Sequence, residues 1–172
     1  MIKQNIFISF VMFESIFVAL YSVFIYYLFI YFKLLTHNIN NNKNIVYILF
    51  IVGFFKHFIG FYSGLHTYYC NNGYACLSVN KNINNDNIYI SKYTNLFMLI
   101  LESITEGYLF CLFGFFLLFI IETIFIIFHK KKRFSINIMY FIIFLIGLLL
   151  YLIFEISGLH HLFCIKKCIK KV

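Results

Sequence analysis

The sequence predicts an all-α membrane protein with four transmembrane helices, arranged as two tandem helical hairpins that form a parallel repeat. Of the 172 residues, 63% are hydrophobic and only 12% are charged, whereas soluble domains average about 25% charged residues. Four apolar runs each exceed the ~20 residues that a helix needs to cross a bilayer. None alternates as a spanning β-strand would. A short motif near the end of the second run returns near the end of the fourth.

The first hairpin repeat is expected within residues 1–90. Its transmembrane helices are predicted at about 6–32 and 45–69, with an Asn-rich connection between them and a polar loop over 71–90. The first run follows a single Lys3 and lacks a small-residue cleavage site, which is typical of an uncleaved signal anchor. We therefore expect the first helix to remain part of the protein.

The second hairpin repeat is expected within residues 91–172. Its helices are predicted at about 96–128 and 134–165, followed by a basic tail. The segment HKKKR at 129–133 separates them and is typical of an anchor to lipid headgroups. The net charge of +8 comes mostly from lysines at the ends of apolar runs, so it does not indicate a nucleic-acid site.

A repeated motif supports the division into two hairpins. The sequence SGLH at 63–66 returns at 157–160, and a cysteine follows each histidine by four residues. Glu14 also matches Glu102 at the start of the odd-numbered helices. Gly53 matches Gly147 at the same offset as the SGLH motif.

The repeat also predicts where these residues lie in the membrane. Because each half contains two helices, both halves enter from the same side. The two glutamates and both SGLH motifs are therefore expected near one membrane face, termed side A. Seven Lys or Arg residues lie on side A and six on the opposite face, so the positive-inside rule predicts no orientation.

The histidines and cysteines of the motif form a candidate metal site. The candidate ligands are His66, Cys70, His160 and Cys164. If the second and fourth helices touch at side A, two imidazoles and two thiolates converge there. This set suits tetrahedral Zn²⁺ and also accepts Cu(I). Glu14 and Glu102 are predicted at similar depth, as partners that orient the imidazoles.

The same motif has two other interpretations. Small Ser and Gly residues let helices approach closely, so the motif is also typical of helix packing. A haem held by His66 and His160 is a weaker alternative, with His57 and His161 as further candidate ligands. His57 precedes His66 by nine residues, which on one continuous helix directs the two rings to opposite faces.

Four cysteines on side A predict thiol chemistry. Each half is expected to form its own disulfide in an oxidising compartment, Cys70 with Cys76 and Cys164 with Cys168. In the cytosol, Cys164 and Cys168 beside lysines would be typical of palmitoylation sites. Cys111 lies in the middle of an apolar run and is expected to pack as a small apolar residue.

Charges inside the apolar runs predict a polar interior. Lys56, Glu122 and Glu155 each cost a few kcal/mol in lipid unless they are paired. We expect a buried pair between Lys56 and one of these glutamates, with an ion or proton path as the functional alternative.

Three glycines in the second run predict close helix packing. Gly53, Gly60 and Gly64 form a small-residue stripe, which is typical of contact with another helix or with a second subunit.

The predicted function is that of a small multi-pass integral membrane protein, a non-enzymatic structural or assembly component whose His/Cys site is stabilised by metal or by disulfides. One alternative is a membrane redox or cofactor-binding protein, and another is a small ion or proton conduit. The absence of a nucleotide loop, a Ser/His/Asp pattern and desaturase-type His boxes favours a non-enzymatic role. The expected partners are the lipid bilayer and other membrane subunits or a second copy, and not nucleic acid. Abundant Phe and Tyr without Pro or Trp indicates an AT-rich genome, such as that of an organelle, a protist or a large DNA virus.

Overall fold

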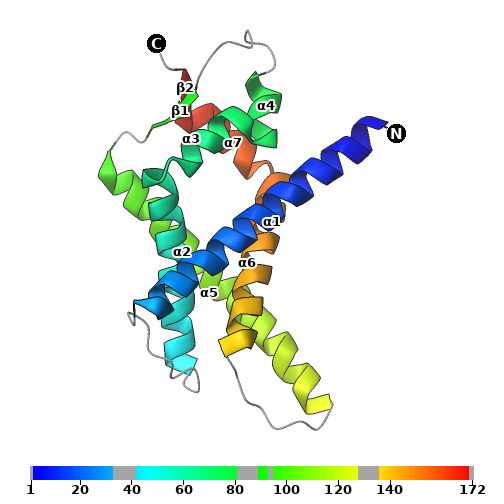
Figure 1. Ribbon diagram of the computed structural model, residues 1–172, viewed down its shortest axis with the longest axis vertical. Helices are drawn as coiled ribbons and strands as arrows, with labels where there is room; N and C mark the ends of the chain where they lie inside the picture. The colour runs from blue at the N-terminus through cyan, green and yellow to red at the C-terminus, as the bar shows by residue number, and fades with distance from the viewer. Residues whose placement is uncertain (1, 33–41, 81–88, 93–94, 128–135, 171–172) are drawn as a thin grey trace.

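A computed structural model describes residues 2–32, 42–80, 89–92, 95–127 and 136–170. Four long helices and a group of short elements at one end make up these residues (Figure 1). The long helices are α1 (Ile2–Tyr31), α2 (Asn42–Tyr62), α5 (Leu96–Ile127) and α6 (Ile136–Ile156). Each contains a segment that is long and apolar enough to span a membrane. The prediction of four long apolar helices is therefore confirmed.

Two of these helices are shorter than predicted, because the chain turns at a glycine after each. The expected continuous helices over 45–69 and 134–165 are interrupted at Gly64 and Gly158, whose φ angles are +80° and +75°. Glycine adopts this left-handed conformation without the steric cost that other residues meet. The chain then starts a new short helix in a new direction. Ser63 therefore lies before the turn, whereas His66 and Cys70 lie on the short helix after it.

The long helices pair across the two predicted halves. α2 packs mainly against α5, and α1 mainly against α6, which it crosses obliquely (Figure 1). Small residues make both crossings close. A Cβ atom added to Gly53 would lie 2.9 Å from the Cα of Gly107, and one added to Gly147 would lie 2.9 Å from the Cα of Ala19. Such close backbone approach is typical of helices packed in a bilayer.

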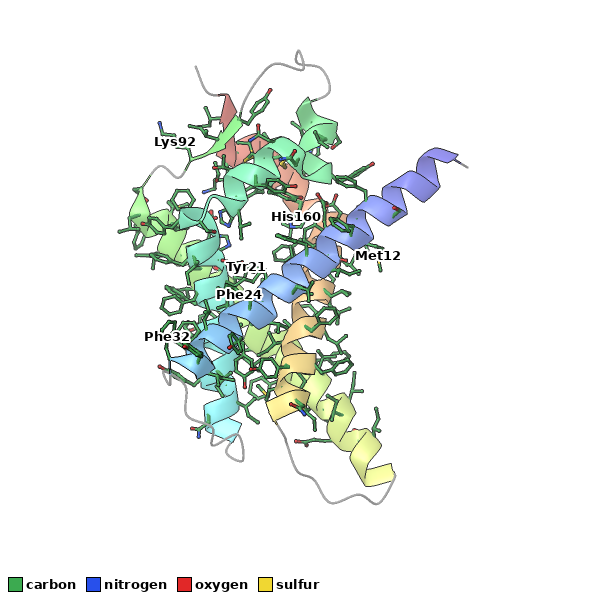
Figure 2. All side chains as sticks on the ribbon, viewed as in Figure 1. Met12, Tyr21, Phe24, Phe32, Lys92 and His160 are labelled. Atoms are coloured by element: carbon green, nitrogen blue, oxygen red, sulfur yellow. A yellow bond between two sulfur atoms is a disulfide. The ribbon has the colours of Figure 1, made fainter. Side chains whose placement is uncertain are left out.

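Apolar side chains lie both inside and outside the helix pairs (Figure 2). A buried cluster that includes Leu49, Phe110 and Ile143 fills the interior. Yet only 28%, 33%, 33% and 39% of the residues are buried in the most apolar segments of the four helices. Outward-facing aromatic residues such as Phe13 and Phe119 are strongly exposed. An outer surface of this kind is unusual for a protein in water and suits contact with lipid.

The short elements gather at one end of the molecule, and we term them the head (Figure 1). The head consists of α3 (Leu65–Asn72), α4 (Tyr74–Asn80), β1 (Tyr89–Ser91), α7 (Leu159–Lys167) and β2 (Cys168–Lys170). β1 and β2 are antiparallel, with Ile90 opposite Ile169. The sequence predicted only a polar loop and a basic tail for α4, β1 and β2, and assigned most of α3 and α7 to the ends of the second and fourth long helices. The Asn-rich connection within the first hairpin lies largely outside the described residues (33–41), and so does the basic segment 129–133.

Candidate functional site: a disulfide-linked head

Hydrogen bonds from Asn71 join α3 to the strand pair. The side-chain oxygen of Asn71 accepts the Tyr89 N–H at 2.8 Å, and its nitrogen donates to the carbonyl oxygens of Tyr89 at 2.7 Å and Thr67 at 2.8 Å. The Lys92 N–H donates to the carbonyl oxygen of Lys167 at 2.9 Å. These bonds satisfy backbone groups at the edge of the small sheet. They also hold the cysteine-bearing helices α3 and α7 in one unit.

Two disulfides cross-link the head, and both connect the first half of the chain with the second. Cys70 of α3 is bonded to Cys168 of β2, and Cys76 of α4 is bonded to Cys164 of α7. The Cα atoms are 5.5 and 5.1 Å apart, within the usual range for a disulfide. The predicted pairing within each half is therefore wrong. α4 packs against α7 and β1 pairs with β2, so each cysteine meets a partner from the other half.

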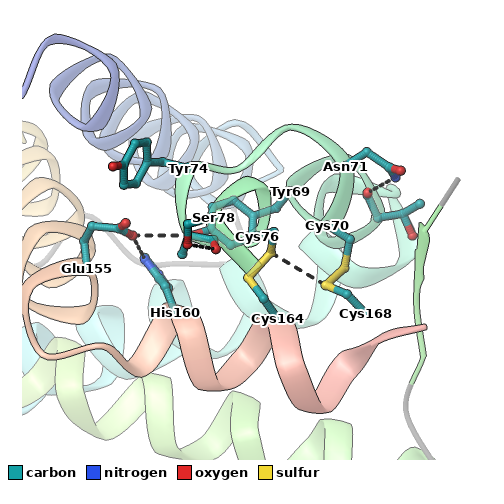
Figure 3. The surroundings of a disulfide bond; sticks show 12 residues. Tyr69, Cys70, Asn71, Tyr74, Cys76, Ser78, Glu155, His160, Cys164 and Cys168 are labelled. Atoms are coloured by element: carbon teal, nitrogen blue, oxygen red, sulfur yellow. Dashed lines mark hydrogen bonds and ion pairs between the residues drawn. A yellow bond between two sulfur atoms is a disulfide. The ribbon is translucent and has the colours of Figure 1, made fainter. Parts of the chain in front are cut away.

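The four bonded cysteines form one sulfur cluster (Figure 3). The Sγ atoms of Cys76 and Cys168 are not bonded to each other and are 3.7 Å apart. Those of Cys76, Cys164 and Cys168 all lie within 4.8 Å of one another. Cys70 and Cys76 have no exposed surface, and Cys164 is 3% exposed. The cluster is therefore largely shielded from water.

His66 lies on α3 and packs against the end of α2. Its ring meets the ring of His57 edge-on, with 4.7 Å between the centroids, and the ring of Phe163 at 5.8 Å. The prediction that His57 and His66 face apart is wrong, because the turn at Gly64 brings α3 back towards α2. Burial, reinforced by the neighbouring His57, lowers the pKa of His66 to about 3. The imidazole of His66 is therefore neutral near pH 7.

His160 occupies the corresponding position on α7 but has different neighbours. Its Nδ1 atom lies 2.8 Å from Oε2 of Glu155 (Figure 3). Its ring packs against Tyr151 at 4.6 Å and Tyr69 at 5.2 Å between centroids. Tyr69 also donates to Glu155 Oε2 at 3.4 Å. His160 is therefore held by a carboxylate and an aromatic cage.

The predicted ligand set does not come together in the disulfide-bonded head. Cys70 and Cys164 are each bonded to another sulfur, and His66 and His160 contact different side chains. In the described part of the chain, the His, Cys, Asp or Glu donors that lie within 4.8 Å of one another in a group of three are cysteines, and neither of these histidines belongs to the group. The close group of metal-binding donors is thus composed of cysteine alone.

The two glutamates expected beside the imidazoles of the motif have other partners. Glu14 accepts a hydrogen bond from the Tyr151 hydroxyl at 2.5 Å and another from the Tyr74 N–H at 3.1 Å. Glu102 lies 2.7 Å from Lys167 Nζ and 3.6 Å from His57 Nε2. Each glutamate thus links a long helix to the head, Glu14 through α4 and Glu102 through α7.

Lys56 forms an ion pair with Glu106 of α5. His57 Nδ1 also lies 2.7 Å from Glu106 Oε2. The predicted partner, Glu122 or Glu155, is therefore wrong. Glu102 and Glu106 are four residues apart and share one face of α5. This spacing could have revealed the pair, had the packing of α2 on α5 been known.

The other two charges of the apolar runs lie apart from this pair. Glu155 holds His160, as described above. Glu122 lines a shallow, open depression between α2 and α5 together with apolar side chains such as Ile45 and Phe119. The three charges therefore do not form one polar path in the described structure.

The three glycines of the predicted stripe have three different roles. Gly53 makes the close crossing with α5. Gly60 lies beside the His66 ring, and a Cβ atom added to Gly60 would lie 3.3 Å from Nε2 of His66. Gly64 adopts the left-handed turn, with nothing near its Cβ direction. A single small-residue stripe is therefore wrong, and only Gly53 serves a close helix crossing.

Comparison with family models, with curated proteins and with solved structures finds no match. The function is therefore inferred from geometry alone. The geometry offers a disulfide-linked head, four apolar helices and internally paired charges.

Proposed function

We propose that the chain is a small multi-pass integral membrane protein with a non-enzymatic, structural role, in which two interlocked helical hairpins present a rigid head at one membrane face. The observation that carries this proposal is the pair of disulfides, both of which cross between the halves at the same end. Such cross-links suit a scaffold that must keep one arrangement of its helices.

The interior of the helix pairs supports residence in a bilayer. Where lipid surrounds a helix, each buried polar group needs a partner within the protein. The hydroxyl groups of Ser15, Ser22 and Ser103 donate to carbonyl oxygens of their own helices at 2.8–2.9 Å. Lys56 and Glu106 neutralise each other. These groups can therefore lie at membrane depth.

Matching contacts support the origin of the two hairpins by duplication. His57 and Tyr151 lie at the same sequence offset as the two SGLH motifs, and each is within reach of the aligned glutamate, Glu102 or Glu14. The close crossings at Gly53 and Gly147 also occupy aligned positions. We infer that the second helix of each hairpin packs against the first helix of the other hairpin, and that this exchange interlocks the halves.

The disulfides also favour one membrane orientation. Structural disulfides persist in oxidising compartments and are rare in the cytosol. The head, and with it both chain termini, is therefore proposed to face the non-cytosolic side. The charge distribution alone predicted neither orientation.

The orientation is tested with a glycosylation acceptor placed on either face and translated with microsomes. An acceptor tail appended after Val172 should be glycosylated, and the same acceptor inserted with spacers after Asn40 should not. The reverse result would place the head in the cytosol and remove the support that the disulfides give.

The interlocking is tested by cutting the chain between the halves. A protease site introduced into 81–88 would be cleaved in purified, oxidised protein. The two fragments should stay together on a denaturing gel without reductant and separate with it. In the double variant Cys164→Ser/Cys168→Ser they should separate in both conditions. Separation of the unmodified halves without reductant would contradict the proposal.

A second candidate function is thiol–disulfide exchange, favoured by the 3.7 Å approach of Cys76 and Cys168. An exchange protein would cycle between oxidised and reduced forms in cells, visible after thiol labelling as two populations that respond to growth conditions. A structural protein would be found fully oxidised.

A further inference from the structure

We propose that the reduced head is a metal site in which Cys70, Cys76, Cys164 and Cys168 bind one thiolate-preferring divalent cation, with Zn²⁺ as the natural candidate. This site differs from the His/Cys set that the sequence suggested, because no histidine takes part. It exists only when both disulfides are open.

Three of the four sulfurs already lie close enough for tetrahedral coordination after small shifts. A Zn–S distance of about 2.3 Å places the sulfurs of a tetrahedral site about 3.7–3.8 Å apart. The Sγ atoms of Cys76 and Cys168 are already 3.7 Å apart, and Cys164 lies within 4.8 Å of both. Cys70 is bonded to Cys168 but lies outside this group of three, so its side chain must turn towards the other sulfurs to become the fourth ligand. Opening the two bonds requires side-chain rotation and only a small separation of the sulfurs.

The backbone around the cluster is held independently of the disulfides. The four cysteines come from four elements, α3, α4, α7 and β2. The Asn71 hydrogen bonds join α3 to β1, and β1 pairs with β2. The hydrogen bond from Lys92 joins the end of α7 to this unit, and α4 packs against α7. The head can therefore keep the four thiols close after reduction, which lowers the ordering cost of metal binding.

The surroundings of the cluster suit thiolates. Three of the four sulfurs are buried, so competing water is excluded. Lys166 and Lys167 in the last turn of α7 precede Cys168 directly. A lysine charge near a cysteine favours the thiolate over the thiol; Lys166 is the candidate here, because Lys167 is paired with Glu102.

The oxidation state decides whether the site exists. Each disulfide accepts two electrons and two protons from a protein dithiol, which becomes a disulfide itself. Two such reductions yield four thiols. Binding of Zn²⁺ then displaces up to four protons to solvent as four Zn–S bonds form. Exchange with two protein disulfides, each of which accepts two electrons and becomes a dithiol, re-forms both disulfides of the head and releases the metal.

The test uses Co²⁺ as a spectroscopic probe on the full chain in mild detergent. The protein is reduced with a phosphine, freed of reductant without oxygen, and titrated. We expect one Co²⁺ per chain, with the intense visible bands of tetrahedral cobalt and a thiolate charge-transfer band, all displaced by Zn²⁺. Oxidised protein should show none of these bands.

Variants assign the ligands. Cys76→Ser and Cys168→Ser should weaken binding at least tenfold, whereas Cys111→Ser and the double variant His66→Ala/His160→Ala should bind as the unmodified chain does. Circular dichroism checks that each reduced protein is helical. A helical reduced chain without cobalt bands overturns the proposal, and so does loss of the helical signal on reduction. Loss of binding in the histidine variant would instead assign the site to the His/Cys set. The cleavage test uses oxidised protein, so its outcome is independent of this one.

Discussion

Single glycines decide where the second and fourth predicted helices end. Gly64 and Gly158 follow a serine in each copy of the motif, and both have a positive φ. A serine–glycine pair before a leucine matches the common helix end in which glycine takes the left-handed position. The signal was present in the sequence, but the apolar run that continues past it concealed the turn.

Replacing Gly64 with alanine should destabilise the fold by about 1–2 kcal/mol, the usual cost of a left-handed non-glycine residue. No atom lies within 4 Å of the added Cβ, so the cost is conformational and not steric. Gly64→Asn should cost less, because asparagine tolerates this conformation better. Thermal unfolding in detergent measures both variants. Equal melting temperatures for the alanine variant and the unmodified chain would show that the turn relaxes.

His66 should make stability depend on pH. Its pKa is lowered to about 3 in the folded protein, chiefly by burial, from an ordinary value of 6.5. Between these values the unfolded chain binds a proton that the folded chain does not. Stability is therefore full above about pH 6.5 and falls as the pH decreases towards 3. His66→Gln should flatten this slope in denaturation measurements, and the exposed His161→Gln should not.

At the scale of elements, the pairing of α2 with α5 explains why a lysine can lie in an apolar helix. Lys56 contacts Glu106, and its Nζ lies 5.4 Å from the centre of the Phe110 ring. His57 binds the second oxygen of the same carboxylate. One glutamate thus serves two basic side chains of α2.

Glu106→Gln should cost about 3–5 kcal/mol, because it leaves Lys56 buried without its anion. Lys56→Met/Glu106→Gln should recover most of this stability, since both charges are then gone. Glu102→Gln is the matched control, one turn away on α5. The side chain of Glu102 is 32% exposed, so its ion pair with Lys167 is worth at most about 1 kcal/mol. A double variant as unstable as Glu106→Gln would show that His57, and not Lys56, depends on this carboxylate.

At the scale of the whole molecule, the disulfides connect residues 98 and 88 positions apart. Closing one loop of this length stabilises a fold by about 5 kcal/mol in the chain-entropy account. Once one bond is formed, the other closes a ring of only about a dozen residues and adds about 3 kcal/mol. The two bonds are therefore strongly non-additive.

We expect Cys76→Ser/Cys164→Ser and Cys70→Ser/Cys168→Ser each to lose about 3 kcal/mol, and the variant without all four cysteines to lose about 8 kcal/mol. Denaturant unfolding of the oxidised proteins measures these values, with Cys111→Ser as the control. Double variants that each lose as much stability as the variant without all four cysteines would point to the pairing within each half, because each double variant would then break both disulfides.

The sequence by itself determined the features that depend on composition and local pattern. Four apolar runs are sufficient to predict four long helices, because each run exceeds the thickness of a bilayer when helical. The repeated SGLH motif also predicted that His66, Cys70, His160 and Cys164 lie at one end. The positions of the four cysteines of the head, near the ends of the second and fourth apolar runs, were sufficient to place them together at this end.

Only the tertiary structure decided which of these residues meet. Helix pairing across the halves brings Glu106 to Lys56 and brings each cysteine to a partner from the other half. Spacing along the chain favoured nearby partners, such as Cys70 with Cys76, and could not reveal contacts between residues almost a hundred positions apart. The physical reason is that such contacts depend on the packing of α1 on α6 and of α2 on α5, which apolar periodicity alone does not specify.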